Sequence, residues 1–260
     1  MLNGRCALVT GSTAGLGYSF AEGFAQAGAD VVINGLCERA EGEAAAAALA
    51  AKYGVRALFD PADLSDPAAI ASMIENAQAT LGSLDILVNN AVVRHFSPIE
   101  SFAPADWDAS IAVNITAVFH AVRLALPQMR ERGWGRIFNI SSYYGFRGVG
   151  NRIDYVTTKT ALLGMTRAIA METATSGITC NALCPGSVLT PAIEERIAGI
   201  ARDTGTPVEE VTRQYAADRS ATGRFVAMEN LAALAVFLCS PAGADITGAA
   251  LPVDGGWFSL

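Results

Sequence analysis

Short apolar segments alternate with helix-like segments along nearly the whole chain of 260 residues. The strand-like segments cover residues 6–10, 30–33, 55–59, 84–88, 136–140, 178–183 and 249–253. Continuous apolar strands separated by helices are typical of a parallel sheet that is covered on both faces. No linker or repeat interrupts the pattern. We therefore expect an α/β fold over residues 1–260, one Rossmann-type domain whose doubly wound parallel β-sheet has helices on both faces.

Composition and charge narrow the classes of partner. Hydrophobic residues make up 52% of the chain and charged residues 17%, which suits one large core and argues against disorder. The net charge of −7 argues against nucleic acid and against an anionic membrane surface as partners. The N-terminus has no basic segment followed by a long apolar run, and we find no run of ~18 apolar residues. We therefore expect no signal peptide, no membrane span and a cytoplasmic protein.

Cysteine and histidine usage favours an ordinary reduced, metal-free protein. The five cysteines are odd in number and form no Cys-x-x-Cys pair, so we expect free thiols, most of them in the core. The two histidines, His95 and His120, have no ligand-like spacing, so we expect no metal site.

A glycine-rich turn joins the first strand to the first helix. Gly11 permits the tight turn, Gly15 lets backbone approach a pyrophosphate, and Gly17 allows close packing of the helix on the sheet. The unpaired N–H groups at the start of a helix favour a negatively charged group. The spacing is Gly-x-x-x-Gly-x-Gly, and its place between a strand and a helix predicts a dinucleotide site.

The residues after the second strand indicate which dinucleotide binds. A site for NADP needs cationic side chains near the 2′-phosphate. Residues 34–38 read Asn-Gly-Leu-Cys-Glu and contain no cation, and Ser12 and Thr13 fill the other common place for one. Arg39 follows, but Glu38 lies beside it. We therefore expect NAD, although the acidic residue that usually binds the ribose hydroxyls is missing as well.

A serine, a tyrosine and a lysine form the candidate catalytic set. Tyr155 and Lys159 are four residues apart on a helix expected over residues 153–175, so they share one face, and Ser142 precedes Tyr155 by thirteen residues. A phenol ordinarily titrates near pH ~10, and a fixed ammonium nearby favours the phenolate. The set predicts a general acid/base with a serine hydroxyl that holds the substrate oxygen.

One charged segment, residues 187–222, departs from the alternation of strands and helices. It contains Thr190-Pro191 and Thr206-Pro207-Val208-Glu209, which predict two short helices, each with a threonine cap and proline at its first position. The carboxyl end of a parallel sheet is where ligands bind in such folds, so we expect this insertion to be a substrate lid.

These motifs resemble the short-chain dehydrogenases/reductases, and the resemblance covers nearly the whole chain. It rests on the glycine motif, Asp63-Leu64, Asn89-Asn90-Ala91, Asn114, Ser142, Tyr155, Lys159, and Pro185-Gly186 with Thr190. The resemblance implies that Tyr155 is the general acid/base and that Lys159 assists it and holds the nicotinamide ribose. It also implies that Ser142 orients the substrate and that Asn114 holds a water of a proton relay. One departure is Val92, where the family usually has glycine.

The resemblance further implies a homotetramer and a set of residues that contact the cofactor. This set is Gly11, Thr13, Gly15, Leu16, Gly17, Leu36, Asp63, Leu64, Asn90, Ala91, Tyr155, Lys159, Pro185, Val188 and Thr190.

Within the family, the chain is similar to the D-3-hydroxybutyrate dehydrogenases, in stretches such as GSTAGLG, LDILVNNA and GITCNALCPG. Those enzymes bind a small carboxylate with Gln, His, Lys and Gln side chains. The matching positions here carry Arg94, Tyr144, Arg152 and Arg196, while Ser187 replaces a tryptophan and Trp257 is retained. The expected substrate-binding residues are therefore Arg94, Ser142, Tyr144, Arg152, Tyr155, Arg196 and Trp257.

We expect an NAD-dependent oxidoreductase that interconverts a secondary alcohol and a ketone on a small anionic substrate. Because guanidinium suits bidentate binding of acidic groups, this substrate is expected to be a 3-hydroxy acid larger or more anionic than 3-hydroxybutyrate. The alternatives are a D-3-hydroxybutyrate dehydrogenase itself, a dehydrogenase of a sulfonated, phosphorylated or carboxylated sugar or polyol, and a dinucleotide-binding sensor without chemistry. The arginines could also be solvated surface residues, with Arg196 paired to Glu194 or Glu195.

Overall fold

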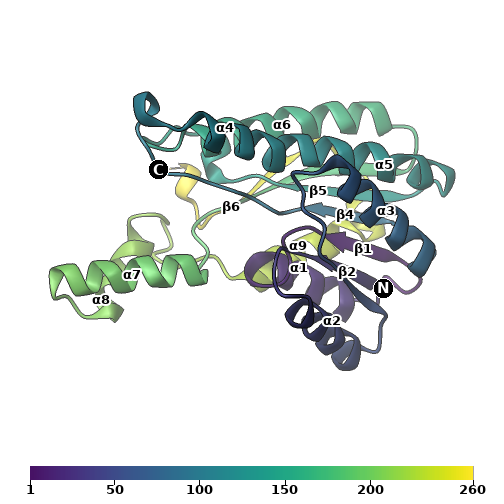
Figure 1. Ribbon diagram of the computed structural model, residues 1–260, viewed down its shortest axis with the longest axis horizontal. Coiled ribbons are helices and arrows are strands. Elements are labelled where there is room, and N and C mark those ends of the chain that lie inside the picture. Colours follow the sequence, from purple (N-terminus) through teal and green to yellow (C-terminus); the bar gives the residue numbers. More distant parts are fainter. Residues whose placement is uncertain (260) are drawn as a thin grey trace.

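The computed structural model describes residues 1–259, and within them seven parallel strands form one sheet (Figure 1). The strands are β1 (Cys6–Val9), β2 (Asp30–Asn34), β3 (Ala57–Asp60), β4 (Ile86–Asn89), β5 (Gly135–Ile140), β6 (Ile178–Pro185) and β7 (Ala250–Val253). Their order is β3-β2-β1-β4-β5-β6-β7, so the direction of winding reverses between β1 and β4. In such sheets the ligand binds at this reversal, beyond the carboxyl ends of the strands.

Helices cover both faces of the sheet (Figure 1). One face is covered by α1 (Gly15–Gln26), α2 (Arg39–Tyr53) and α9 (Met228–Leu238). The other is covered by α3 (Pro67–Leu81), α4 (Pro104–Ile111), η2 (Ala112–Thr116), α5 (Ala117–Glu131) and α6 (Ile153–Thr173). Short turns of helix complete the chain: η1 (Ile99–Ser101), η3 (Tyr143–Gly145), η4 (Pro241–Gly243) and η5 (Trp257–Ser259). The predicted doubly wound α/β fold is confirmed.

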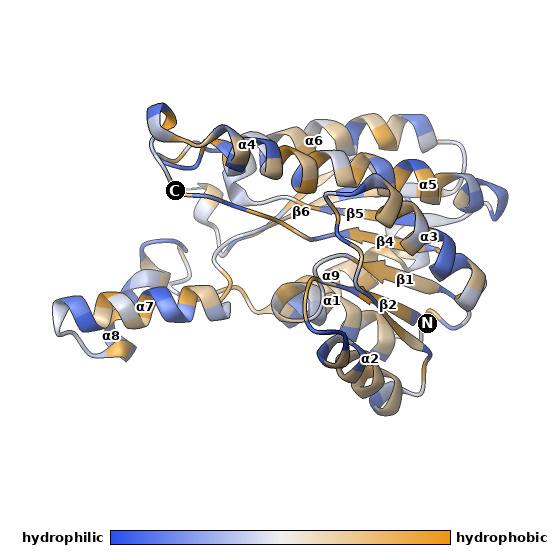
Figure 2. Ribbon diagram, viewed as in Figure 1, coloured by the Kyte–Doolittle hydropathy of each residue, from blue (hydrophilic) through white to orange (hydrophobic). Residues whose placement is uncertain are grey.

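Two hydrophobic cores lie on the two faces of the sheet. Side chains alternate along a strand, so Ala7 and Val9 of β1 enter one core while Cys6 and Leu8 enter the other. All four are almost completely buried, which explains why the strands read as continuous apolar segments. Figure 2 shows the central strands as the hydrophobic part of the molecule and α7 and α8, which lie outside the sheet, as more hydrophilic.

Helices α7 (Pro191–Thr204) and α8 (Val208–Ala217) extend from the end of the sheet where the strands terminate (Figure 1). Thr190 is the N-cap of α7, as predicted, although its side chain makes no capping hydrogen bond. The expected cap at Thr206 is wrong, because α8 starts at Val208 after Pro207. The hydroxyl of Thr206 instead accepts a hydrogen bond of 3.0 Å from that of Thr204.

The helical stretch from Pro104 to Glu131 is interrupted. Between α4 and α5 the turns of η2 widen into a π-helix, a local distortion that sequence periodicity does not reveal and that is frequent at functional sites. The stretch Pro104–Glu131 is long and apolar enough to cross a membrane by length and composition, since an 18-residue window within it has a mean hydropathy of 1.6. Side chains such as Val118, Ala121 and Val122 are buried in one of the two cores, which is the arrangement of a core helix in a globular protein.

Candidate active site

A cavity of about 1020 Å³ lies at the carboxyl ends of the strands and extends to helices α7 and α8. It brings together nearly all of the expected site residues: Gly11, Gly15, Leu16, Gly17, Leu36, Asp63, Leu64, Asn90, Ala91, Arg94, Ser142, Tyr144, Arg152, Tyr155, Lys159, Pro185, Val188, Thr190 and Arg196. Three expected residues, Thr13, Asn114 and Trp257, are not among those that line the cavity. Each of these three contacts residues that do line it, as described below.

The glycine turn has the geometry that a pyrophosphate site requires. Gly11 and Gly15 both have a φ of +59°, which favours glycine. A Cβ on Gly11 would come within 2.8 Å of the Cα of Ala91, whereas nothing lies within 4 Å of a Cβ on Gly15. A Cβ on Gly17 would come within 2.6 Å of the Asn90 amide nitrogen. Close packing therefore fixes the turn at Gly11 and Gly17, and Gly15 leaves open space in front of the helix.

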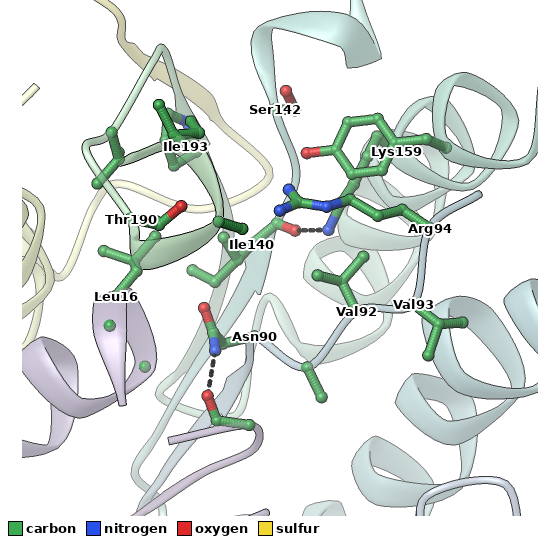
Figure 3. A pocket seen from close by; sticks show the side chains of 18 of the residues that line it. Leu16, Asn90, Val92, Val93, Arg94, Ile140, Ser142, Lys159, Thr190 and Ile193 are labelled. Atoms are coloured by element: carbon green, nitrogen blue, oxygen red, sulfur yellow. Dashed lines mark hydrogen bonds between the residues drawn. The ribbon is translucent and has the colours of Figure 1, made fainter. Parts of the chain in front are cut away.

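Two asparagines brace this turn. The amide of Asn90 donates to the carbonyl oxygens of Thr10 and Gly11 at 3.0 and 2.9 Å (Figure 3). Asn34, at the end of β2, accepts from the Gly11 N–H at 3.2 Å and donates to the carbonyls of Asp60 and Ala62. This role of Asn34 was not predicted from the sequence. Its only sequence signal is a polar residue at the carboxyl end of a buried strand.

The segment after β2 shows why Thr13 is close to the site without lining it. A Cβ on Gly35 would meet the Thr13 hydroxyl oxygen at 2.8 Å, so Thr13 lies directly behind this segment. Leu36 lines the cavity, and 74% of its surface is exposed. This exposed apolar side chain offers a surface against which a flat ring of a ligand could pack. Arg39 pairs with Glu43 at 3.2 Å and does not line the cavity.

Lys159 is anchored at the centre of the site. Its ammonium is buried and donates a hydrogen bond of 2.6 Å to the carbonyl oxygen of Ile140 (Figure 3). It also lies 5.6 Å from the centre of the Tyr155 ring. Burial, and second to it the positive charge of Arg94, lowers the pKa of Lys159 to about 7. The ammonium is therefore held in place at an energetic cost.

Ser142 and the aromatic residues after it form the wall opposite Tyr155. Ser142 is buried, and its hydroxyl accepts from the Tyr144 N–H at 3.2 Å, which leaves the hydroxyl hydrogen free for a ligand. Tyr144 packs against Tyr155 with ring centres 6.3 Å apart. Burial raises the pKa of Tyr143 far above its ordinary value, so this neighbouring phenol is a poor acid/base. Trp257 packs behind the pair, 3.8 Å from the Tyr143 ring centre and 5.7 Å from that of Tyr144.

Asn114 lies in the π-helical segment η2 and holds the loop that follows β4. Its side-chain oxygen accepts from the Val93 N–H at 2.9 Å, and its amide donates to the Val93 carbonyl at 2.9 Å and to Thr158 at 3.2 Å. Both amide hydrogens of the side chain are therefore used by protein groups. Next to Val93, Val92 lines the cavity. Among the described residues Asn151 is the only non-glycine with a positive φ, so the loop accommodates Val92 without left-handed backbone.

Three arginines, Arg94, Arg152 and Arg196, line the cavity. The guanidinium carbons of Arg152 and Arg196 lie 4.3 and 4.8 Å from the centre of the Phe96 ring, and Arg152 lies 4.4 Å from that of Tyr155. Figure 3 shows the Arg94 guanidinium directed toward Lys159. Burial, with a smaller contribution from the charge of Arg94, lowers the pKa of Arg152.

None of these three arginines forms a salt bridge within the described residues, so the alternative pairing of Arg196 with Glu194 or Glu195 is not found. The Nε of Arg152 is buried and has no hydrogen-bond partner. Unpaired guanidinium groups and an unused buried donor are costly in a cavity, and an anionic ligand would remove that cost.

Two further residues contribute to this region and were not predicted from the sequence. Phe96 is the ring on which two guanidiniums rest, and Arg219, from the segment after α8, is a fourth arginine that lines the cavity. Arg219 stacks on Tyr215 with its guanidinium carbon 3.8 Å from the ring centre. Neither residue could be recognised from the sequence, because Phe96 belongs to no motif and Arg219 lies in a segment with many other charged residues.

The cavity suits a nicotinamide dinucleotide along its length. The N-terminus of α1 and the open space at Gly15 fit a pyrophosphate, which carries negative charge. At the inner end, the Thr190 hydroxyl oxygen is buried, lines the cavity and has no hydrogen-bond partner. A polar group of the cofactor would satisfy it.

The chain is similar to known dehydrogenases over its whole length. The family described as short chain dehydrogenase matches residues 5–200. A D-beta-hydroxybutyrate dehydrogenase of Cupriavidus necator is 44% identical over 260 residues, covering 100% of both chains, and one of Rhizobium meliloti is 39% identical over 253 residues, covering 97% of this chain and 98% of the relative. The crystal structure of L-sorbose reductase from Gluconobacter frateurii, complexed with NADPH and L-sorbose, has a TM-score of 0.95 at 31% identity, covering 100% of this chain and 98% of that one.

Proposed function

Because the chain belongs to the short-chain dehydrogenase family, we propose that it is an NAD-dependent oxidoreductase interconverting a secondary alcohol and a ketone on a small anionic substrate. One observation carries the proposal: a single cavity is lined both by Ser142, Tyr155 and Lys159 and by Arg94, Arg152 and Arg196, which have no carboxylate partner among the described residues. The first set suits proton transfer at an alcohol oxygen, and the second suits an acidic group elsewhere on the same substrate.

The cofactor half of the cavity would hold NAD by the turn at Gly11–Gly17, by Leu36, Asp63 and Asn90, and by Pro185, Val188 and Thr190. When bound, the nicotinamide supplies the hydride acceptor or donor for the carbinol carbon. The protein residues contribute position and electrostatics around that exchange.

Tyr155 transfers the proton at the substrate oxygen, and Ser142 orients that oxygen with the hydroxyl hydrogen that its contact to Tyr144 leaves free. Lys159 supplies a positive charge beside the phenol, and its bond to Ile140 keeps it there. Asn114 fixes the loop at Val93 that forms one wall of the site.

The distribution of cations supports NAD rather than NADP. Among the described residues, the cations that line the cavity are Lys159 and four arginines, at positions 94, 152, 196 and 219. All of them come from the loop after β4, from the start and body of α6, or from the lid segment. The β1–α1 turn and the segment after β2, where a 2′-phosphate would lie, contribute none. The NADPH in the sorbose reductase structure belongs to that protein.

The arginines support a substrate that is larger or more anionic than 3-hydroxybutyrate, of the 3-hydroxy acid type. Two curated relatives are named for that monocarboxylate, but three guanidiniums around one small carboxylate would leave positive charge uncompensated. A hydroxy acid with a second acidic group, or a sugar or polyol with a carboxylate, sulfonate or phosphate, matches them better.

We also propose that the enzyme is a homotetramer in the cytoplasm.

A substrate panel tests the function. Purified enzyme with NAD is offered 3-hydroxybutyrate, hydroxy dicarboxylic acids, and sulfonated and phosphorylated polyols, and NADH formation is followed by absorbance. We expect turnover, with the highest kcat/KM on a substrate with more negative charge than 3-hydroxybutyrate. Best turnover of 3-hydroxybutyrate would make the chain a D-3-hydroxybutyrate dehydrogenase, and NAD binding without any turnover would favour a sensor.

A further inference from the structure

Asp154 is a completely buried carboxylate at the start of α6, where it accepts hydrogen bonds from several directions. One oxygen accepts from the Tyr155 N–H at 2.6 Å. The other accepts from the His95 N–H at 3.0 Å and from the Ser110 hydroxyl at 2.8 Å, and it lies 3.3 Å from the Nδ1 of His95. A carboxylate taken out of water is costly unless such bonds satisfy it, so this network is built around the charge.

The network joins two segments that are far apart in the sequence and adjacent in the site. His95 lies between Arg94 and Phe96, and Asp154 lies two residues after Arg152 and directly before Tyr155. The His95–Asp154 contact therefore sets the position of one pair, Arg94 and Phe96, against the other pair, Arg152 and Tyr155. A role in helix capping does not account for it, because an acidic residue in a first turn needs no partner on another loop.

We propose that Asp154 and His95 are positioning residues that hold the anion-binding arginines in register with the acid/base tyrosine. The inference rests on the proposed anionic substrate and names the device that aligns its two ends. Neither residue lines the cavity, so both act through their neighbours.

Phe96 transmits this alignment. Its ring lies 4.3 Å from the guanidinium carbon of Arg152 and 4.8 Å from that of Arg196, so a shift of the loop displaces the surface on which both groups rest. Arg94, on the other side of His95, would move with it. Misplacement of a positioning group by about 1 Å can cost on the order of 100-fold in rate, which makes a buried clamp useful at this point.

The first test measures anion binding without turnover. Malonate, a simple dicarboxylate, is titrated into the parent and into Asp154→Asn by calorimetry in the presence of NADH. Asp154→Asn keeps the size of the side chain and removes its charge. We expect a malonate Kd at least tenfold weaker, together with an NADH Kd close to that of the parent. His95→Gln should behave in the same way.

Matched controls use the remaining partners of the same cluster. Ser110→Ala removes a hydroxyl that donates to Asp154 and lies 3.3 Å from the Nδ1 of His95, and it leaves the direct His95–Asp154 contact in place. Asp106→Asn removes the half-exposed carboxylate 3.6 Å from the Nε2 of His95. Both should bind malonate within about twofold of the parent. Larger losses in the controls than in Asp154→Asn would overturn the assignment to the His95–Asp154 contact.

A double-mutant cycle separates positioning from general stability. If Asp154 acts through the arginines, Asp154→Asn should add little to the loss of malonate binding already caused by Arg152→Ala. Fully additive losses, or unchanged binding in Asp154→Asn alone, would contradict the positioning role. A parent enzyme that binds no malonate, with Arg152→Ala indistinguishable from it, would instead contradict the anionic-substrate function.

Discussion

The ammonium of Lys159 donates a 2.6 Å hydrogen bond to the carbonyl oxygen of Ile140, the last residue of β5. This bond ties α6 to the end of a central strand and holds the Lys159 ammonium 5.6 Å from the ring centre of Tyr155. The same burial that fixes the charge disfavours it, since burial and then the charge of Arg94 lower the pKa of Lys159 to about 7. The charged form of Lys159 is therefore energetically unfavourable in the folded protein.

Lys159 should make stability depend on pH in a predictable direction. Its folded pKa of about 7 lies below the ordinary lysine value of 10.5, so the unfolded chain binds more protons between these two pH values. The contribution of this group to the free energy of unfolding therefore rises as pH increases from about 7. Below pH ~7 Lys159 is charged in the folded protein, and the full cost of burying its charge lowers the free energy of unfolding. Each pKa unit corresponds to about 1.36 kcal/mol.

Urea unfolding of the parent and Lys159→Met at pH 6 and pH 9.5, without cofactor, measures this contribution. The quantity to compare is the free energy of unfolding of Lys159→Met minus that of the parent. This difference should be more favourable to the variant at pH 6 than at pH 9.5, by several kcal/mol. The comparison between two pH values cancels the loss of the bond to Ile140, which is common to both. An equal difference at the two pH values would show that Lys159 carries no such penalty.

Tyr155→Phe should abolish turnover nearly completely while it leaves NAD affinity largely intact. The substitution removes the transferable proton and keeps the ring that packs against Tyr144 and Arg152. Steady-state kinetics and NADH fluorescence titration separate the two effects. Activity within tenfold of the parent would rule out Tyr155 as the acid/base.

Arg152→Ala should raise KM for the true substrate by the equivalent of roughly 2–5 kcal/mol, because it removes a partly buried guanidinium that would pair with an acidic group. Arg196→Ala should act in the same direction. Arg202→Ala is the matched control, since Arg202 is exposed on α7, the helix that carries Arg196, and does not line the cavity. The anion site is disproved if both cavity variants bind substrate as well as Arg202→Ala does.

The enzyme should use NAD with a higher kcat/KM than NADP. Arg39→Ala should leave that preference unchanged, because Arg39 pairs with Glu43 and points outside the cavity lining. Cys37→Arg should shift the preference toward NADP by adding a cation after β2. Equal kcat/KM values for the two cofactors in the parent would show that another cation reaches the 2′-phosphate.

Helix α6 should contribute to a homotetramer. Ala161, Gly164 and Ala168 form an exposed face of small residues that would let another helix approach, and nothing lies within 4 Å of a Cβ on Gly164 in the single chain. Light scattering should therefore give a tetramer mass for the parent and a smaller assembly for Gly164→Arg. A monomer mass for the parent at assay concentration would exclude this assembly.

Local patterns were enough to predict the framework of the cavity. The apolar segments gave the strands, and the glycine spacing gave the turn before α1, because strand burial and positive φ angles leave direct traces in residue type. Tyr155 and Lys159 could be paired because an i, i+4 spacing places side chains on one helix face. The π-helical turns around Asn114 could not be predicted, because the apolar periodicity there differs little from that of an ordinary helix.

The sequence by itself determined the strand segments, the glycine turn before α1 and the spacing of the candidate catalytic residues, since each depends on residues close together in the chain. Only the tertiary structure decided that Phe96 lies beneath Arg152 and Arg196, that Asp154 holds His95, and that Lys159 is bound to Ile140. These contacts join residues from separate loops and helices. Their distances and their burial, and therefore the charges they hold in place, depend on how the loops pack at the carboxyl edge of the sheet, which no local pattern encodes.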